Sequence, residues 1–100
     1  IKLSLPYNGS EGKLCNRTPK SILEYPIVES LTDNGVITIA AGGGGIPVIA
    51  SEEGFTGIEA VIDKDFAAAK LAELVGADYL IILTGVDNVY VNWNKPDQKN

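Results

Sequence analysis

Four consecutive glycines constrain this chain more than any other feature of its sequence. They directly follow a β-branched, apolar run at residues 36–41, which is typical of a strand buried on both faces. Because glycine carries no Cβ, a ligand can approach the backbone N–H groups closely and a positive φ is available at each step. At a strand end this predicts a cradle for a phosphate or carboxylate, built by Gly42, Gly43, Gly44 and Gly45.

Other interpretations of the glycines fit the neighbouring residues less well. A flexible linker is the alternative, but Pro47 and the apolar flanks argue against it, because such linkers are rich in serine and lie between polar stretches. The fingerprint G-x-G-x-x-G would need glycine where Pro47 and Val48 stand. No Gly-Lys-Ser or Gly-Lys-Thr occurs, so the chain carries neither a dinucleotide fingerprint nor a Walker P-loop.

Composition narrows the functional classes. The net charge of -5 offers no electrostatic surface for nucleic acid or an anionic membrane, so a phosphate would be held by local groups. The single cysteine, Cys15, forms no intrachain disulfide and no apolar run suffices for a membrane span, which leads us to expect a cytoplasmic protein. Without histidine, Ser-His and Cys-His nucleophiles and His-ligated metals are excluded within this chain. The absence of methionine suggests an internal piece of a longer protein.

Helices and strands are expected to alternate after a polar start. Residues 1–20 are rich in turn residues and predict a surface segment or the frayed edge of a missing part. A short helix is expected at residues 24–33, with Pro26 in its first turn, and an alanine-rich helix at residues 65–75, ending before Gly76. Buried strands are expected at residues 36–41 and 79–84, and shorter extended stretches at residues 47–50, 58–61 and 89–92.

The order of strand, helix and strand predicts a βαβ unit. We therefore expect an α/β fold with a mainly parallel sheet and helices on both faces. Ligands of such sheets bind at the carboxyl ends of the strands, where residues 42–45 and residues 84–88 both lie.

Two polar segments are candidates for chemistry. Asp63, Lys64 and Asp65 stand at the expected start of a helix, where they either cap free N–H groups or neutralise and orient a phosphoryl group. The second segment follows the second buried strand and is either a polar turn or part of a nucleotide pocket. Its candidate residues are Thr84, Gly85, Asp87 and Tyr90.

Several motifs together closely resemble the carbamate kinases, which have the amino-acid-kinase fold. They occur in the family order at residues 40–49, 57–67, 82–84 and 94–99. The resemblance implies that the glycine run is the family's second glycine-rich loop, near carbamoyl phosphate. It further implies that Asp65 is the catalytic-centre aspartate, that Lys64 contacts the phosphate, that Asp63 lies beside the substrate and that residues 84–90 bind the nucleotide.

The chain also departs from the family pattern. The family often has serine where Ala41 stands, aspartate where Gly85 stands and glycine where Asn88 stands. Residues 1–25 match poorly, which divides the chain into a surface or connecting segment and, at residues 26–100, part of the nucleotide- and phosphate-binding region. The family's N-terminal glycine loop and its further phosphate-binding lysines are absent, so the isolated 100 residues are expected to be inactive.

The implied reaction is reversible phosphoryl transfer between carbamoyl phosphate and Mg-ADP, giving Mg-ATP and carbamate. The resemblance thus implies ATP or ADP and Mg²⁺ as cofactors, a place in arginine metabolism, and a homodimer for the full-length protein. In such a protein, Gly44→Val is expected to abolish transfer while leaving the fold largely intact. Two alternatives remain: another phosphotransferase of the same fold, and a catalytically silent nucleotide-binding or oligomerisation module.

Overall fold

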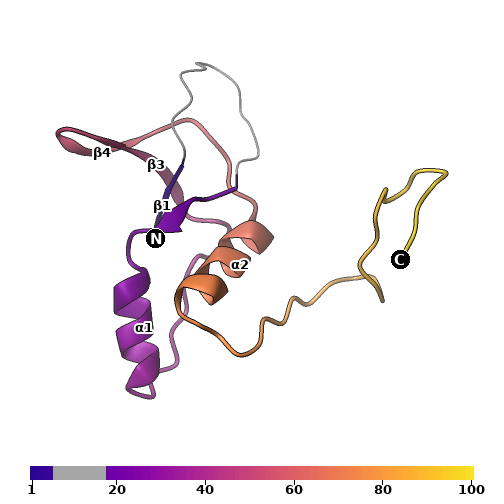
Figure 1. Cartoon of the computed structure of the whole chain (residues 1–100), viewed down its shortest axis with the longest axis horizontal. Helices are drawn as coiled ribbons and strands as arrows, with labels where there is room; N and C mark the ends of the chain where they lie inside the picture. Colours follow the sequence, from indigo (N-terminus) through magenta and orange to yellow (C-terminus); the bar gives the residue numbers. More distant parts are fainter. Residues whose placement is uncertain (6–17) are drawn as a thin grey trace.

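A four-stranded mixed sheet organises the chain (Figure 1). The computed structural model describes residues 1–5 and 18–100. The strands lie in the order β2-β1-β3-β4, and only the β1–β3 pair is parallel. Their bounds are β1 Lys2–Ser4, β2 Ser21–Ile22, β3 Ile46–Ser51 and β4 Gly54–Gly57.

Both helices form where the sequence predicts them. Helix α1 spans Tyr25–Asp33 with Pro26 in its first turn, where the missing N–H does no harm. Helix α2 spans Lys64–Leu74, and the chain leaves it through Gly76 at a φ of 64°. Neither helix of the described residues has the length and apolar character needed to cross a membrane.

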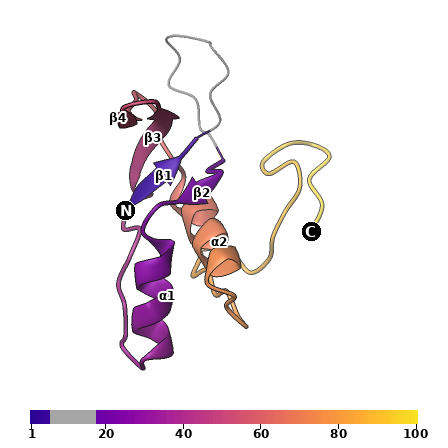
Figure 2. The ribbon, with the colours of Figure 1, turned by 60° about the vertical axis from the view of Figure 1, so that its left-hand side comes forward.

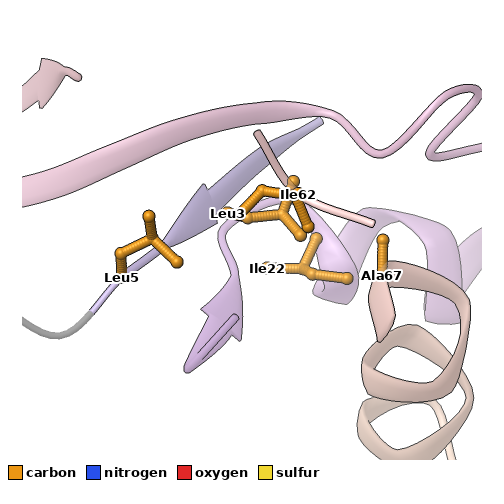
Figure 3. Packing of buried hydrophobic residues seen from close by; sticks show 5 residues of the cluster. All are labelled: Leu3, Leu5, Ile22, Ile62 and Ala67. Carbon is orange, nitrogen blue, oxygen red and sulfur yellow. The ribbon is translucent and has the colours of Figure 1, made fainter. Parts of the chain in front are cut away.

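The buried core joins the sheet to α2 (Figure 3). β1 and the residue after it supply Leu3 and Leu5, and β2 supplies Ile22. Ile62, directly before α2, and Ala67 on the helix complete the cluster. The expectation of a surface segment at residues 1–20 is therefore wrong for the start of the chain, since Leu3 is fully buried. The part of that expectation at residues 6–17, including Cys15, lies outside the described residues.

The two predicted buried strands are not strands in this structure. Residues 36–41 and 79–84 carry no regular secondary structure, and Ile39 and Leu83 are 96% and 93% exposed. A fully buried strand needs neighbours on both edges and cover on both faces, and no described strand pairs with either segment. The predicted βαβ unit is therefore not assembled within this chain.

Beyond α2 the chain extends away from the sheet (Figures 1 and 2). Its last part closes on itself through mutual backbone hydrogen bonds of Val91 and Lys99, at 2.8 and 3.1 Å. The Asn92 side chain donates to Asp97, and the rings of Tyr90 and Trp93 lie 5.0 Å apart. These local contacts order the segment without joining it to the core.

Glu24 connects the start of α1 to β1. Its carboxylate accepts a hydrogen bond of 2.7 Å from the backbone N–H of Lys2, and the Lys2 Nζ lies 3.7 Å away. Burial acts to raise the pKa of Glu24, but backbone N–H groups of Lys2 and Glu24 and the charge of Lys2 outweigh it, so the pKa lies below its ordinary value.

We expect the Leu3→Ala variant of the isolated chain to lower the free energy of unfolding by about 3 kcal/mol, because a fully buried side chain leaves a cavity. Leu83→Ala is the matched control, since its side chain is 93% exposed. Urea unfolding followed by circular dichroism measures both variants. Equal losses from the two would contradict the assignment of the core.

The Glu24 contact should also depend on pH. Because the folded pKa is lowered, its stabilisation is complete above the ordinary glutamate pKa and disappears as the pH falls through the folded pKa. We expect Glu24→Gln to lower the free energy of unfolding by up to about 1 kcal/mol at neutral pH and to have little effect in acid. Urea titrations at both pH values, with the exposed Glu59→Gln as control, test this; a pH-independent difference would rule it out.

Candidate functional site

The glycine loop immediately precedes β3 and uses part of its own hydrogen-bonding capacity. The N–H of Gly42 donates to the carbonyl of Ala40, and that of Gly44 donates to Ala41, both at 2.9 Å. Among the described residues, the N–H groups of Gly43 and Gly45 have no backbone acceptor. The predicted anion cradle therefore narrows to these two donors.

The loop begins with two successive residues in the left-handed region. Ala41 has a φ of 69° and Gly42 a φ of 52°. Glycine adopts this conformation without steric cost, whereas alanine does so at a cost of about 1 kcal/mol. Strained backbone of this kind gathers at functional sites, which is consistent with a binding role for the loop.

The four glycines differ in the space around them. A Cβ on Gly42 or Gly43 would meet nothing within 4 Å. A Cβ on Gly44 would lie less than 3.0 Å from the carbonyl oxygen of Ile62, and one on Gly45 would lie 2.8 Å from the carbonyl oxygen of Ile1. Packing therefore requires glycine at the last two positions, whereas the first two leave an open approach.

The expectation that Gly44→Val would leave the fold largely intact is wrong for this reason. Gly44 is buried, and its φ of 138° lies where side chains are rarely tolerated. A valine would meet the backbone of Ile62 and would displace the loop or the neighbouring segment.

Asp63 is the N-cap of α2. Its side chain accepts a hydrogen bond of 2.7 Å from the backbone N–H of Asp65. Of the two aspartates predicted as possible caps, Asp63 takes this role, and the Asp65 carboxylate is left for other contacts. That carboxylate lies 3.3 Å from the Lys64 Nζ, and both side chains are at least half exposed. Lys64 and the positive end of the helix thus present favourable charge to an anion.

The glycine loop and the start of α2 lie against each other. The carbonyl that faces Gly44 belongs to Ile62, which immediately precedes the cap residue Asp63. Backbone donors of the loop and the Asp63-Lys64-Asp65 segment, which are far apart in the sequence, therefore share one region. This is the convergence that a phosphoryl site between them requires.

The nucleotide-binding candidates lie elsewhere. The Thr84 hydroxyl accepts from the Val86 N–H at 3.0 Å and lies 2.8 Å from the Val86 carbonyl, so it closes a local turn. Gly85 and Asp87 are exposed in this turn, and Tyr90 packs on Trp93. Figures 1 and 2 show this part of the chain away from the sheet, because the preceding apolar segment has no strand to pair with. The nucleotide role of these residues stays a prediction.

Ile62 lies within the motif at residues 57–67, but its contact with the glycine loop is not predicted from the sequence. Its side chain is 3% exposed, and its carbonyl faces the glycine loop. A signal for it is present in the sequence: an apolar residue before an N-cap commonly packs on the fourth helical residue, here Ala67.

Comparison with known proteins identifies the family of this chain. The sequence profile of the amino acid kinase family matches residues 4–100. The chain belongs to the amino acid kinase family. Membership confirms the predicted α/β fold class, of which the mixed sheet and its two helices form a part.

Within the family, the chain is similar to carbamate kinases. The enzyme of Latilactobacillus sakei is 65% identical and that of Thermoplasma acidophilum 58% identical, each over 81 residues, which is 81% of this chain. The structure of carbamate kinase from Giardia lamblia bound to AMP-PNP superposes with a TM-score of 0.72 at 43% identity, covering 84% of this chain and 30% of that one. The chain spans about a quarter of the length of the first two of these relatives, 26% and 27%.

The cap assignment makes a prediction about Asp63. We expect Asp63→Ala to lower the free energy of unfolding by about 1 kcal/mol, because the N–H of Asp65 loses its acceptor. Asp63→Asn keeps a side-chain oxygen at this position and should be nearly neutral. Thermal and urea unfolding measure both variants. If the alanine variant is as stable as the asparagine variant, the Asp63 side chain is not the cap.

Proposed function

We propose that this chain is part of a carbamate kinase, which transfers a phosphoryl group reversibly between carbamoyl phosphate and Mg-ADP to give Mg-ATP and carbamate. One observation carries the proposal: the backbone of the glycine loop contacts the residue that precedes Asp63, Lys64 and Asp65. The identity to carbamate kinases over 81 residues supports the choice among the family's reactions.

In the proposed site, charge stabilisation and positioning perform the chemistry. The N–H groups of Gly43 and Gly45, the ammonium of Lys64 and the N-terminus of α2 would hold the oxygens of the transferred group as negative charge redistributes. The phosphorus forms a bond to the terminal phosphate oxygen of ADP and breaks its bond to the carbamoyl oxygen. Asp65, whose carboxylate lies 3.3 Å from the Lys64 Nζ, would keep that ammonium in place.

Mg²⁺ would enter this site with the nucleotide. The described residues contain no cluster of three or more aspartate, glutamate, cysteine or histidine side chains that could hold a metal by themselves. Mg²⁺ often keeps several waters and binds through one or two carboxylates together with phosphates, and Asp63 and Asp65 are the carboxylates at this site. When bound, Mg²⁺ neutralises phosphate charge.

Nucleotide binding is assigned to Thr84, Gly85, Asp87 and Tyr90. We propose that this turn reaches the site when the apolar residues 79–84 pair as a strand in the sheet of a longer protein. The Giardia lamblia relative that superposes on this chain was determined with AMP-PNP, which supports a nucleotide substrate. The likeness to carbamate kinases is also the basis for proposing a cytoplasmic homodimer that acts in arginine metabolism.

Substitutions in the full-length protein that contains this chain test the proposal. Lys64→Ala removes a cation from the phosphate, and Asp65→Asn removes the charge that holds that cation. We expect each to lower kcat on the order of 10²-fold. A coupled assay of ATP formation from carbamoyl phosphate and Mg-ADP measures the effect.

Lys70→Gln is the matched control, because Lys70 pairs with Glu73 at 2.6 Å further along the same helix. Its kcat should equal that of the unsubstituted protein. Should Asp65→Asn lower the melting temperature and spare kcat, Asp65 has a structural role only.

A further inference from the structure

We infer that Gly44 and Ile62 are positioning residues, whose backbone contact sets the place of Lys64 and Asp65 relative to the open half of the glycine loop. The glycine run is thus divided: Gly42 and Gly43 leave an open approach to the loop, and Gly44 fixes the loop to the segment before α2. This inference rests on the proposed function for its effect on catalysis, but the contact itself is a property of the fold.

The first step is the absence of free space at Gly44. Gly44 is buried, and any Cβ there would come under 3.0 Å from the carbonyl oxygen of Ile62, with the carbonyl carbon at 3.2 Å. These are backbone atoms, so no flexible side chain can move aside. The loop and the segment before α2 can approach this closely only because position 44 is glycine.

The second step is the rigidity of Ile62. Its side chain is 3% exposed and packs in the cluster that contains Leu3 and Ala67 (Figure 3). Because the Ile62 side chain is packed in the core, a side chain at position 44 that displaces the Ile62 carbonyl cannot be accommodated by rotating Ile62 into solvent. The displacement passes to the next residue, Asp63, and through its cap to the N–H of Asp65.

The third step is that the other end of the loop is fixed as well. A Cβ on Gly45 would come 2.8 Å from the Ile1 carbonyl and would collide with the Leu3 side chain. The Ile1 carbonyl also accepts a hydrogen bond of 2.8 Å from Ile46, the first residue of β3. Core, loop and helix start therefore form one connected unit, and a misplacement of about 1 Å at a catalytic group lowers rates about 10²-fold.

The test compares Gly44→Ala with Gly54→Ala in the full-length protein that contains this chain. Gly54 has a φ of 123°, near the 138° of Gly44, but a Cβ there meets nothing within 4 Å. The control variant Gly54→Ala therefore has a backbone strain similar to that of Gly44→Ala, but its added Cβ meets no other atom. Hydrogen exchange of the Asp65 amide reports the geometry, and kcat and KM per folded molecule report the catalysis.

We expect Gly44→Ala to speed exchange at the Asp65 amide and to lower kcat about 100-fold with a smaller change in KM for ADP. Gly54→Ala should leave both readouts unchanged. Ile62→Val, which loosens the buried anchor and retains the carbonyl, should change both readouts in the same direction as Gly44→Ala but less. It provides the test if Gly44→Ala does not fold.

Two outcomes would overturn the inference: equal effects of Gly44→Ala and Gly54→Ala, or an Asp65 amide that neither Gly44→Ala nor Ile62→Val disturbs. The first outcome would show that backbone strain alone explains the loss of activity in Gly44→Ala. The second would show that the position of the glycine loop does not affect the first turn of α2. If the amide responds but the unsubstituted protein makes no ATP from carbamoyl phosphate and Mg-ADP, the proposed function fails and the positioning contact stands.

Discussion

Backbone contact between Gly44 and Ile62 is the constraint on which the candidate site depends. A Cβ on residue 44 would lie less than 3.0 Å from the Ile62 carbonyl oxygen, so the two main-chain segments can approach this closely only because residue 44 is glycine. The contact places the N–H donors of the glycine loop beside the N-terminus of α2. It also gives the glycines two functions, since Gly44 and Gly45 satisfy packing while Gly42 and Gly43 leave the approach open.

The core reaches the site through a few buried apolar side chains. Ile62 packs with Leu3 and Ala67, so the residue that faces the glycine loop is also part of the cluster that holds the sheet to the helix. The cap at Asp63 then fixes the first turn of α2. As a result, the charged side chains of Lys64 and Asp65 extend into solvent from a rigid base, which suits groups that act on a ligand.

Local signals in the sequence predict the local parts of this structure. Residue types at helix ends predict helix α2 to within one residue at each end, Pro26 in the first turn of α1 and Asp63 as a possible cap of α2. The strand β1, in which only Leu3 is buried, escapes prediction because three residues give no periodic signal. Residues 36–41 and 79–84 have the composition of buried strands, but burial depends on partners that no local pattern supplies. The approach of Gly44 to Ile62 is missed for the same reason.

The exposed apolar segments also have a consequence for folding kinetics. Ile37, Ile39 and Leu83 are almost fully exposed, on stretches whose backbone groups have no strand partner among the described residues. Such stretches are templates for wrong pairing and aggregation until their neighbours arrive. In a longer chain made on the ribosome, α2 and its cap can form early from local contacts. If residues 36–41 and, as proposed above, residues 79–84 pair as strands in that longer chain, the pairing has to wait for residues distant in the sequence and is slower than the formation of α2.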